Sequence, residues 1–144
     1  MSGAERLYTS ELLALTLKLA AYPFDEALPL EGTARSKSCG STLALRLALD
    51  GKGVIAQLGM RVHACAVGQA SAAIFAEAAS GRDRGAIELA ARQMERWLAG
   101  EGAMPRWLGV AALDPARAYP ARHGAMMLPW RAALGALSSV AASS

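Results

Sequence analysis

Residues 38–66 read SCGSTLALRLALDGKGVIAQLGMRVHACA, and this stretch decides the fold. Four leucines alternate with small or polar residues over residues 42–49, and a second strand-like run over 54–62 follows the turn Asp50-Gly51-Lys52-Gly53. Alternation with a period of two on both sides of a glycine-rich turn is typical of a β-hairpin. The stretch therefore predicts two antiparallel strands joined by a tight turn.

The chain's two cysteines stand just outside the two predicted strands. If the turn is centred between Gly51 and Lys52, residues whose numbers sum to about 103 face each other. Cys39 then lies opposite Ala64 and beside Cys65, so we expect the two thiols to meet at one end of the sheet. Cys65 also directly precedes an alanine-rich segment that reads as a helix, and the positive end of a helix dipole favours a thiolate.

Helical patterns surround the hairpin. The spacing of apolar residues predicts helices over 5–20, 66–79, 83–99 and 124–140, with Asp83 as an N-cap and Pro129 tolerated only in the first turn of the last helix. Residues 28–37 indicate a loop or a short edge strand, and 104–119, interrupted by prolines, a loop with one helical turn around 107–113. Residues 141–144 are expected to be a disordered tail.

The order of these elements is one helix, two or three strands and then helices, without β-α-β alternation. This order predicts an α+β fold in which a small antiparallel sheet carries helices packed on one face. A length of 144 residues fits a single domain spanning 1–144 and is sufficient to bury a core without disulfides.

Composition narrows the class of protein. Two cysteines in a chain of this length indicate a reducing compartment, so we expect a cytoplasmic location. The net charge is +3, but lysines and arginines are spread along the chain without a basic stripe, so no nucleic-acid binding is expected. The apolar segment 12–21 contains Lys18 and is too short to span a bilayer, so no membrane binding is expected.

Four side chains are candidate metal ligands: Cys39, Cys65, His63 and His123. Two cysteines with one or two histidines suit tetrahedral zinc or part of an iron–sulfur cluster. Other readings stay open: the cysteines as buried packing residues, a disulfide between them if their Cα atoms lie within about 6 Å, and His63 as a strand residue facing solvent. No phosphate-binding glycine loop is present, and we expect no enzymatic activity.

Four motifs follow one another across nearly the whole chain. They are Leu7-Tyr8, then Ser38-Cys39-Gly40-Ser41 with the turn Leu49-Asp50-Gly51, then Cys65 with Ala70-Ser71-Ala72, and finally Tyr119-Pro120-Ala121-Arg122 with Leu128 and Trp130. With these motifs the chain resembles the NifU/IscU/SufU-type iron–sulfur cluster assembly scaffolds, and most of all the SufU-like branch. The resemblance implies an α+β fold in which three cysteines and an aspartate at an exposed tip hold zinc, iron or a nascent cluster. It also implies that a cysteine desulfurase supplies the sulfur.

Only part of that ligand set is present. Two of the family's cysteines map onto Cys39 and Cys65, whereas its aspartate falls on Ser41 and its third cysteine on Ala125. The residue before that third cysteine, a histidine or lysine in much of the family, falls on Gly124, with His123 one position further back.

Three accounts of this incomplete set remain. In the first, His123 is a third ligand, and water, glutathione or a partner residue supplies the fourth. In the second, a homodimer pools two cysteines from each chain. In the third, metal chemistry has been lost and the chain survives as a module that binds the desulfurase or another assembly protein.

The sequence thus predicts a scaffold-like protein of iron–sulfur cluster assembly with Cys39, Cys65 and His123 as ligands of iron, zinc or a cluster. Cys65 is expected to be the thiolate most disposed to accept sulfur, with Cys39 as its co-ligand. The alternative is a metal-free module that binds a cysteine desulfurase, and a thiol–disulfide switch between the two cysteines is a third interpretation.

Overall fold

The computed structural model of the protein describes residues 7–143. Its strands are β1 (Leu30–Arg35), β2 (Thr42–Leu49) and β3 (Ile55–His63). Its helices are α2 (Ser10–Leu17), α3 (Ala66–Ala79), α4 (Arg84–Leu98) and α5 (His123–Ser143), with 3-10 segments η1 (Lys18–Ala21), η2 (Val110–Ala118) and η3 (Pro120–Arg122). The predicted α+β fold is confirmed, and residues 28–37 do contain a third strand.

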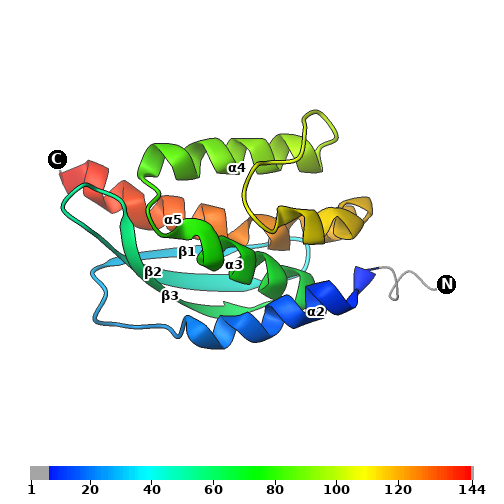
Figure 1. Ribbon diagram of the computed structural model, residues 1–144, viewed down its shortest axis with the longest axis horizontal. Helices are drawn as coiled ribbons and strands as arrows, with labels where there is room; N and C mark the ends of the chain where they lie inside the picture. Colours follow the sequence, from blue (N-terminus) through cyan, green and yellow to red (C-terminus); the bar gives the residue numbers. More distant parts are fainter. Residues whose placement is uncertain (1–6, 144) are drawn as a thin grey trace.

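The three strands form one antiparallel sheet in the order β1-β2-β3. The alternation in β2 works as predicted, since Leu43, Leu45 and Leu47 are buried on the inner face while Arg46 lies on the outer face. Helices α3 and α5 pack on the inner face, α2 lies against α3, and α4 packs on α5 as an outer layer away from the strands (Figure 1).

The hairpin register differs from the predicted one by two residues. Thr42 pairs with His63 and Ala44 with Arg61, and the ladder ends there, so Cys39 lies in a loop and has no partner strand residue. A bulge between Ala48 and Leu49 widens the connection, and the Asp50 N–H donates to the Val54 carbonyl at 2.9 Å. A shift of two residues keeps every side chain on its predicted face, which is why the core pattern survived the error.

Helix α5 lies directly on β1. A Cβ atom built on Gly32 would stand 1.8 Å from the Ala132 carbonyl oxygen, so only glycine permits this approach. The first turn of α5 consequently lies beside the end of β1, where the loop to β2 begins.

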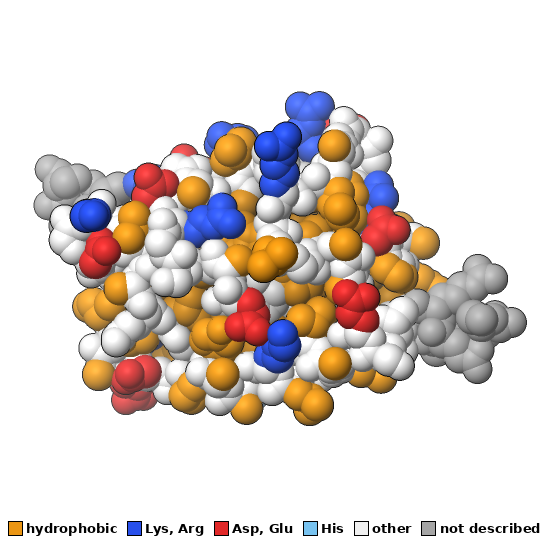
Figure 2. Space-filling model, in the orientation of Figure 1, with side chains coloured by type: hydrophobic (Ala, Val, Ile, Leu, Met, Phe, Trp, Pro, Cys, Tyr) orange, Lys and Arg blue, Asp and Glu red, His pale blue; other side chains and the backbone are white. Residues whose placement is uncertain are grey.

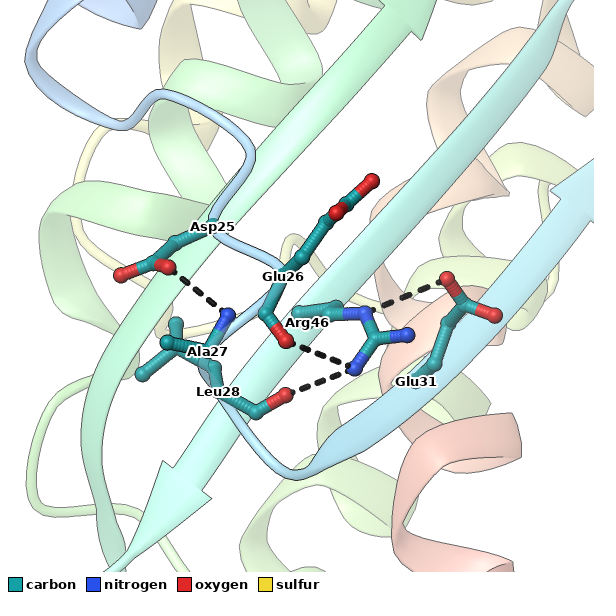
Figure 3. A network of polar contacts seen from close by, with 6 residues as sticks. All are labelled: Asp25, Glu26, Ala27, Leu28, Glu31 and Arg46. Atoms are coloured by element: carbon teal, nitrogen blue, oxygen red, sulfur yellow. Dashed lines mark hydrogen bonds and ion pairs between the residues drawn. The ribbon is translucent and has the colours of Figure 1, made fainter.

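The outer face of the sheet is crossed by residues 22–29, which run from η1 to β1. The Met60 N–H of β3 donates to the Tyr22 carbonyl at 2.9 Å, which fixes the start of this segment. The Arg46 guanidinium donates to the carbonyls of Glu26 and Leu28, at 3.2 and 2.9 Å, and pairs with Glu31 at 3.3 Å (Figure 3). The crossing covers the part of the outer face that lies away from Thr42 and His63.

Most helix predictions are confirmed. Helix α3 has the predicted bounds, and Asp83 caps α4 by accepting from the Ala86 N–H at 2.8 Å. The first helix starts at Ser10 with Thr9 as its cap, and the predicted residues 5 and 6 lie outside the described part of the chain.

Three details after α4 differ from the prediction. The 104–119 region holds a 3-10 run over 110–118 that starts after Gly109, whose φ is +91°, and not a turn around 107–113. Helix α5 continues through Pro129 in its second turn and extends to Ser143, so residues 141–143 are helical, while residue 144 lies outside the described range. No helix within 7–143 has both the length and the apolarity needed to cross a bilayer.

Candidate thiol site at the end of the sheet

Cys39 lies exposed in the loop that joins β1 to β2. Two backbone hydrogen bonds close this loop: the Ser36 N–H donates to the Ser41 carbonyl at 2.8 Å, and the Gly40 N–H donates to the Ser36 carbonyl at 3.0 Å. Gly40 has a φ of +70°, a left-handed conformation that glycine adopts without strain. The sequence Cys39-Gly40 therefore presents the thiol on a defined turn.

Two serine hydroxyls surround the sulfur of Cys39. Its Sγ lies 3.4 Å from the Oγ of Ser36 and 3.0 Å from the Oγ of Ser41. These contacts, that of Ser36 first, lower the pKa of the Cys39 thiol, and the positive charge of Arg122 lowers it further. The Cys39 S–H donates to the Ser36 Oγ, whereas either atom can be the donor between Cys39 and Ser41. The lowered pKa means that the loop favours the thiolate, which is the nucleophilic and metal-binding form of this cysteine.

Cys65 is the N-cap residue of α3, as the sequence predicted. It is half-buried, and its carbonyl accepts from the Gln69 N–H at 2.9 Å. It follows His63 by two residues, and His63 pairs with Thr42, so the chain segments bearing Cys39 and Cys65 leave the sheet at the same end. Both cysteines are free thiols.

Ala125, where the resemblance implies a third cysteine, is buried in this chain. Ala125 has an exposed fraction of 0%, and a Cβ built on Gly68 would stand 3.3 Å from the Cβ of Ala125 and 2.7 Å from that of Ala64. The first turns of α3 and α5 therefore contact each other through small residues. Ala125 is therefore buried at this contact and is not accessible from solvent.

Two buried serines, Ser36 and Ser41, lie beside Cys39. A Cβ on Gly124 would come within 2.5 Å of the Ser36 Oγ, so Ser36 fills the space that a larger residue at position 124 would need. Ser41, where the resemblance implies an aspartate, is 5% exposed, and its Oγ lies 3.0 Å from the Cys39 sulfur. The Ser38 hydroxyl donates to the Ala121 carbonyl at 2.9 Å and ties the loop to the segment before α5.

His123 is oriented by a backbone group. Its Nε2 lies 2.8 Å from the Arg117 carbonyl, which can only accept, so Nε2 carries the proton and Nδ1 keeps the lone pair of the neutral ring. This is how protein scaffolds commonly orient histidine ligands. His123 also lines a small cavity with Glu95 and Leu98 of α4.

His63 lies exposed on the outer face of the sheet. Across residues 7–143, the structure contains no group of three or more His, Cys, Asp or Glu side chains placed to hold a metal ion. The predicted set of Cys39, Cys65 and His123 therefore does not converge as a preformed centre in this conformation.

Ser36 is the site residue that sequence reasoning missed. It lies one residue past the end of β1, where it continues the inward-facing series of Gly32 and Ala34, and it is 2% exposed. A buried polar residue usually has a hydrogen-bonding role. The alternation of residues 32, 34 and 36 was present in the sequence. The neighbours of Ser36, which are Cys39 and Gly124, could be identified only in the folded chain.

No family model and no curated protein matches the sequence. Among solved structures, the N-terminal part of a nitrogen-fixing NifU-like protein from Brucella abortus matches with a TM-score of 0.89 and 26% identity, over 99% of this chain and 100% of that one. A putative iron–sulfur cluster assembly scaffold protein for the SUF system from Fervidobacterium islandicum AW-1 matches with a TM-score of 0.79 and 22% identity, over 91% and 96%. A hypothetical protein solved at 2.3 Å matches with a TM-score of 0.71 and 19% identity, over 88% and 96%.

The fold is thus that of a class of small α+β proteins that includes iron–sulfur cluster assembly scaffolds. The resemblance seen in the sequence motifs is confirmed, because the chain has the fold of the NifU-like N-terminal domain and is similar to it over almost its whole length. Ser41, Gly124 and Ala125 stand at three positions where the resemblance to the family implies other residues.

Proposed function

We propose that this chain acts in iron–sulfur cluster assembly as a scaffold-like protein, with Cys39 and Cys65 as the ligands of iron, zinc or a nascent cluster held as cargo. The observation that carries the proposal is the retention of two free thiols at one end of the sheet, in a fold that matches a NifU-like domain over 99% of its length. Thiolates are the ordinary ligands of iron–sulfur clusters and suit zinc equally well.

The donor set of one chain fits half of such a site. Tetrahedral iron or zinc takes four donors, and one chain supplies two sulfurs, because Ala125 is sealed and Ser41 is a poor donor at neutral pH. We therefore favour two chains that pool their cysteines around one cargo. His123, with its Nδ1 lone pair available, is the third ligand in the version where one chain holds the ion alone.

The sulfur donor in this proposal is a cysteine desulfurase, and the chain itself is not an enzyme. Cys39 is better placed than Cys65 to receive sulfur, because it is exposed and its pKa is lowered by Ser36, Ser41 and Arg122. This assignment reverses the one that the helix N-terminus at Cys65 suggested. The proposal places the protein in the cytoplasm.

The direct test is anaerobic reconstitution with ferrous iron and sulfide, and separately with zinc, followed by metal analysis and a visible absorbance spectrum. Wild type is compared with Cys39→Ser, Cys65→Ser and the double variant. The matched control is His63→Ala, at the same end of the sheet but outside the ligand set. We expect binding in wild type and the control and its loss in each cysteine variant. Absence of bound metal in wild type, or full binding in the double variant, would overturn the proposal.

The second candidate is a metal-free module that binds a cysteine desulfurase. The observations that favour it are the closed position at Ala125 and the lack of a three-donor group among residues 7–143. It predicts that desulfurase binding, measured by calorimetry, is the same for wild type and for the double cysteine variant, while neither protein binds metal.

A further inference from the structure

A groove runs along the exposed face of α4, on the side turned away from α5. It has a volume of about 490 Å³, and its walls are α4 and the segment 102–106 that follows it. The buried side chains of α4, among them Met94 and Trp97, face the core and leave the opposite face open to solvent. The groove therefore belongs to a layer of the molecule separate from the sheet that carries the cysteines.

Local hydrogen bonds build the second wall. Gly100 has a φ of +77°, its N–H donates to the Trp97 carbonyl at 3.1 Å, and the Glu101 N–H donates to the Arg96 carbonyl at 2.8 Å. This is the Schellman pattern, which turns the chain back at the end of a helix. A Cβ on Gly102 would stand 3.1 Å from the Cβ of Arg96, so the returning segment lies close against the helix.

Three arginines line the groove, and no carboxylate does: Arg92, Arg96 and Arg106. Among the described residues, Arg92 and Arg106 make no hydrogen bond or ion pair, and Arg96 donates only to the Glu101 carbonyl, at 3.3 Å. The acidic residues along α4 are engaged elsewhere, since Glu88 pairs with Arg84 at 2.8 Å and Glu95 with Arg131 at 3.8 Å. The groove thus carries uncompensated positive charge.

Apolar side chains lie between these arginines. Leu89 is 49% exposed and Met104 is 47% exposed, and both line the groove although they are far apart in the sequence. On this face of the molecule, basic side chains gather over α4 and the turn after it, with hydrophobic side chains among them (Figure 2). An exposed apolar surface framed by charge of one sign is typical of a protein interaction site.

We propose that this groove binds an acidic peptide segment of a partner protein, whose carboxylates meet Arg92, Arg96 and Arg106 while an apolar side chain covers Leu89 and Met104. Charge complementarity selects this occupant, because guanidinium groups pair with carboxylates in a directed, two-pronged geometry. The apolar surface gives the peptide a contact that a nucleic-acid backbone would not use. The proposal does not depend on the thiol site or on the function proposed for it.

The test uses fluorescence anisotropy with a short labelled peptide of mixed glutamate and leucine. Three comparison probes are measured in the same way. They are the same peptide with glutamine for glutamate, the same peptide with serine for leucine, and a single-stranded DNA of similar length. We expect the glutamate–leucine peptide to bind best, and its affinity to fall as salt is raised from low to physiological ionic strength.

The groove variant is Arg92→Glu with Arg96→Glu, and the matched control is Arg35→Glu with Lys37→Glu, which changes the net charge equally at exposed positions elsewhere. We expect about a tenfold loss of peptide affinity in the groove variant and little change in the control. Leu89→Ser with Met104→Ser should weaken binding by about fivefold, since it removes the apolar contact. Thermal melting of each variant checks that the fold is intact.

Three outcomes would overturn the proposal. The first is equal loss of peptide binding in the groove and control variants, which would mean that only net charge matters. The second is DNA binding tighter than peptide binding and lost in the groove variant. The third is self-association of wild type that the groove variant abolishes, with no peptide binding, which would identify a second copy of this chain as the occupant.

Discussion

The hydroxyls of Ser36 and Ser41 form the polar surroundings of the Cys39 thiol. Where the family is expected to place a carboxylate, this chain places a hydroxyl that lies 3.0 Å from the sulfur, and Ser36 adds a second hydroxyl from the end of β1. Hydrogen bonds donated to a thiolate stabilise the charged form without occupying it as a metal would. The surroundings of Cys39 therefore favour its thiolate form.

Removal of either hydroxyl should raise the pKa of Cys39. The folded-state pKa is lowered, so the thiolate persists to a lower pH than in an ordinary cysteine, and Ser36→Ala or Ser41→Ala should shift the midpoint of alkylation upward. At pH 7 we expect alkylation by iodoacetamide to slow several-fold, because less thiolate is present. The measurement is the pH dependence of the rate in a Cys65→Ser background, where Cys39 is the only thiol. Unchanged midpoints in both serine variants would contradict the assigned cause.

The closed position of Ala125 leads to a second prediction at this scale. In a background without Cys39 and Cys65, a thiol introduced by Ala125→Cys should react with a disulfide reagent at least about a hundredfold more slowly than one introduced by Ala121→Cys. Ala125 is fully buried against α3, whereas Ala121 is exposed. The added sulfur should also cost about 1–3 kcal/mol of unfolding free energy through overpacking. Comparable reaction rates at the two positions would show that the site is open.

At the scale of elements, the contact between β1 and α5 sets the position of the thiol loop. Gly32→Ala would place a Cβ 1.8 Å from the Ala132 carbonyl oxygen, and that backbone atom can move only if α5 moves with it. We expect a loss of about 3 kcal/mol or more of unfolding free energy, measured by urea denaturation. Gly51→Ala is the control, because nothing lies within 4 Å of its added Cβ. Equal stability of the two variants would mean that α5 is not seated on β1.

A group of polar contacts joins the segment around η1 to α3. The Tyr22 hydroxyl donates to Glu77, and Lys18 pairs with Glu77 at 3.2 Å. The hydrogen bond raises the pKa of Tyr22 to about 12 and lowers that of Glu77. The stability from the lowered Glu77 pKa is present above the ordinary carboxyl range near pH 4 and is lost as pH falls through the lowered pKa.

Tyr22→Phe removes the hydroxyl that donates to Glu77. At neutral pH we therefore expect wild type to have a larger free energy of unfolding than this variant. The difference should shrink as pH falls below about 4, because protonated Glu77 no longer needs the hydroxyl. On the alkaline side, the stability from the raised Tyr22 pKa is full below about pH 10 and is lost as pH rises toward about 12. Urea titrations at a series of pH values measure both limbs. A difference that does not vary with pH would rule out these contacts as the cause.

Elements with local signals were predictable from the sequence. Helices α3 and α4 carry their own stop and cap residues, and Asp83 caps α4 with a side chain three residues from its donor. The hairpin register was not predictable, because the Asp50 carboxylate accepts from the N–H groups of Lys52 and Val54 and holds a wider loop than a two-residue turn. The 3-10 run of η2 has no periodic pattern of its own, so the sequence predicted only one helical turn around 107–113, which overlaps the start of the observed run.

The candidate site also has features that were predictable from local sequence and features that were not. Placement of Cys39 and Cys65 at one end of the sheet followed from strand alternation and a helix start, which are local properties. The role of Ser36 and the closure of Ala125 depend on α5 meeting β1 and α3, contacts between residues about ninety and sixty positions apart in the chain. No local pattern reports such contacts.

At the scale of the whole molecule, the proposed function depends on the number of ligands that one chain supplies to the cargo. One chain brings two sulfurs to the tip, and a cluster needs four ligands, so two copies related by a twofold axis are the simplest complete set. Cys39 is exposed on its loop, which makes this pooling sterically accessible. A dimer held by the cargo should exist only while the cargo is present.

Native mass spectrometry after anaerobic reconstitution measures this directly. We expect a monomer without iron, a dimer that contains one cluster after loading, and a return to monomer when a chelator removes the iron. Cys39→Ser should stay monomeric and iron-free, and His123→Ala should load and dimerise like wild type, because the pooled thiolates need no histidine. A loaded monomer would contradict pooling. If His123→Ala then lost its iron, the single-chain version with His123 as third ligand would replace it, since the Nδ1 left free by the Arg117 hydrogen bond is the one remaining nitrogen donor on α5.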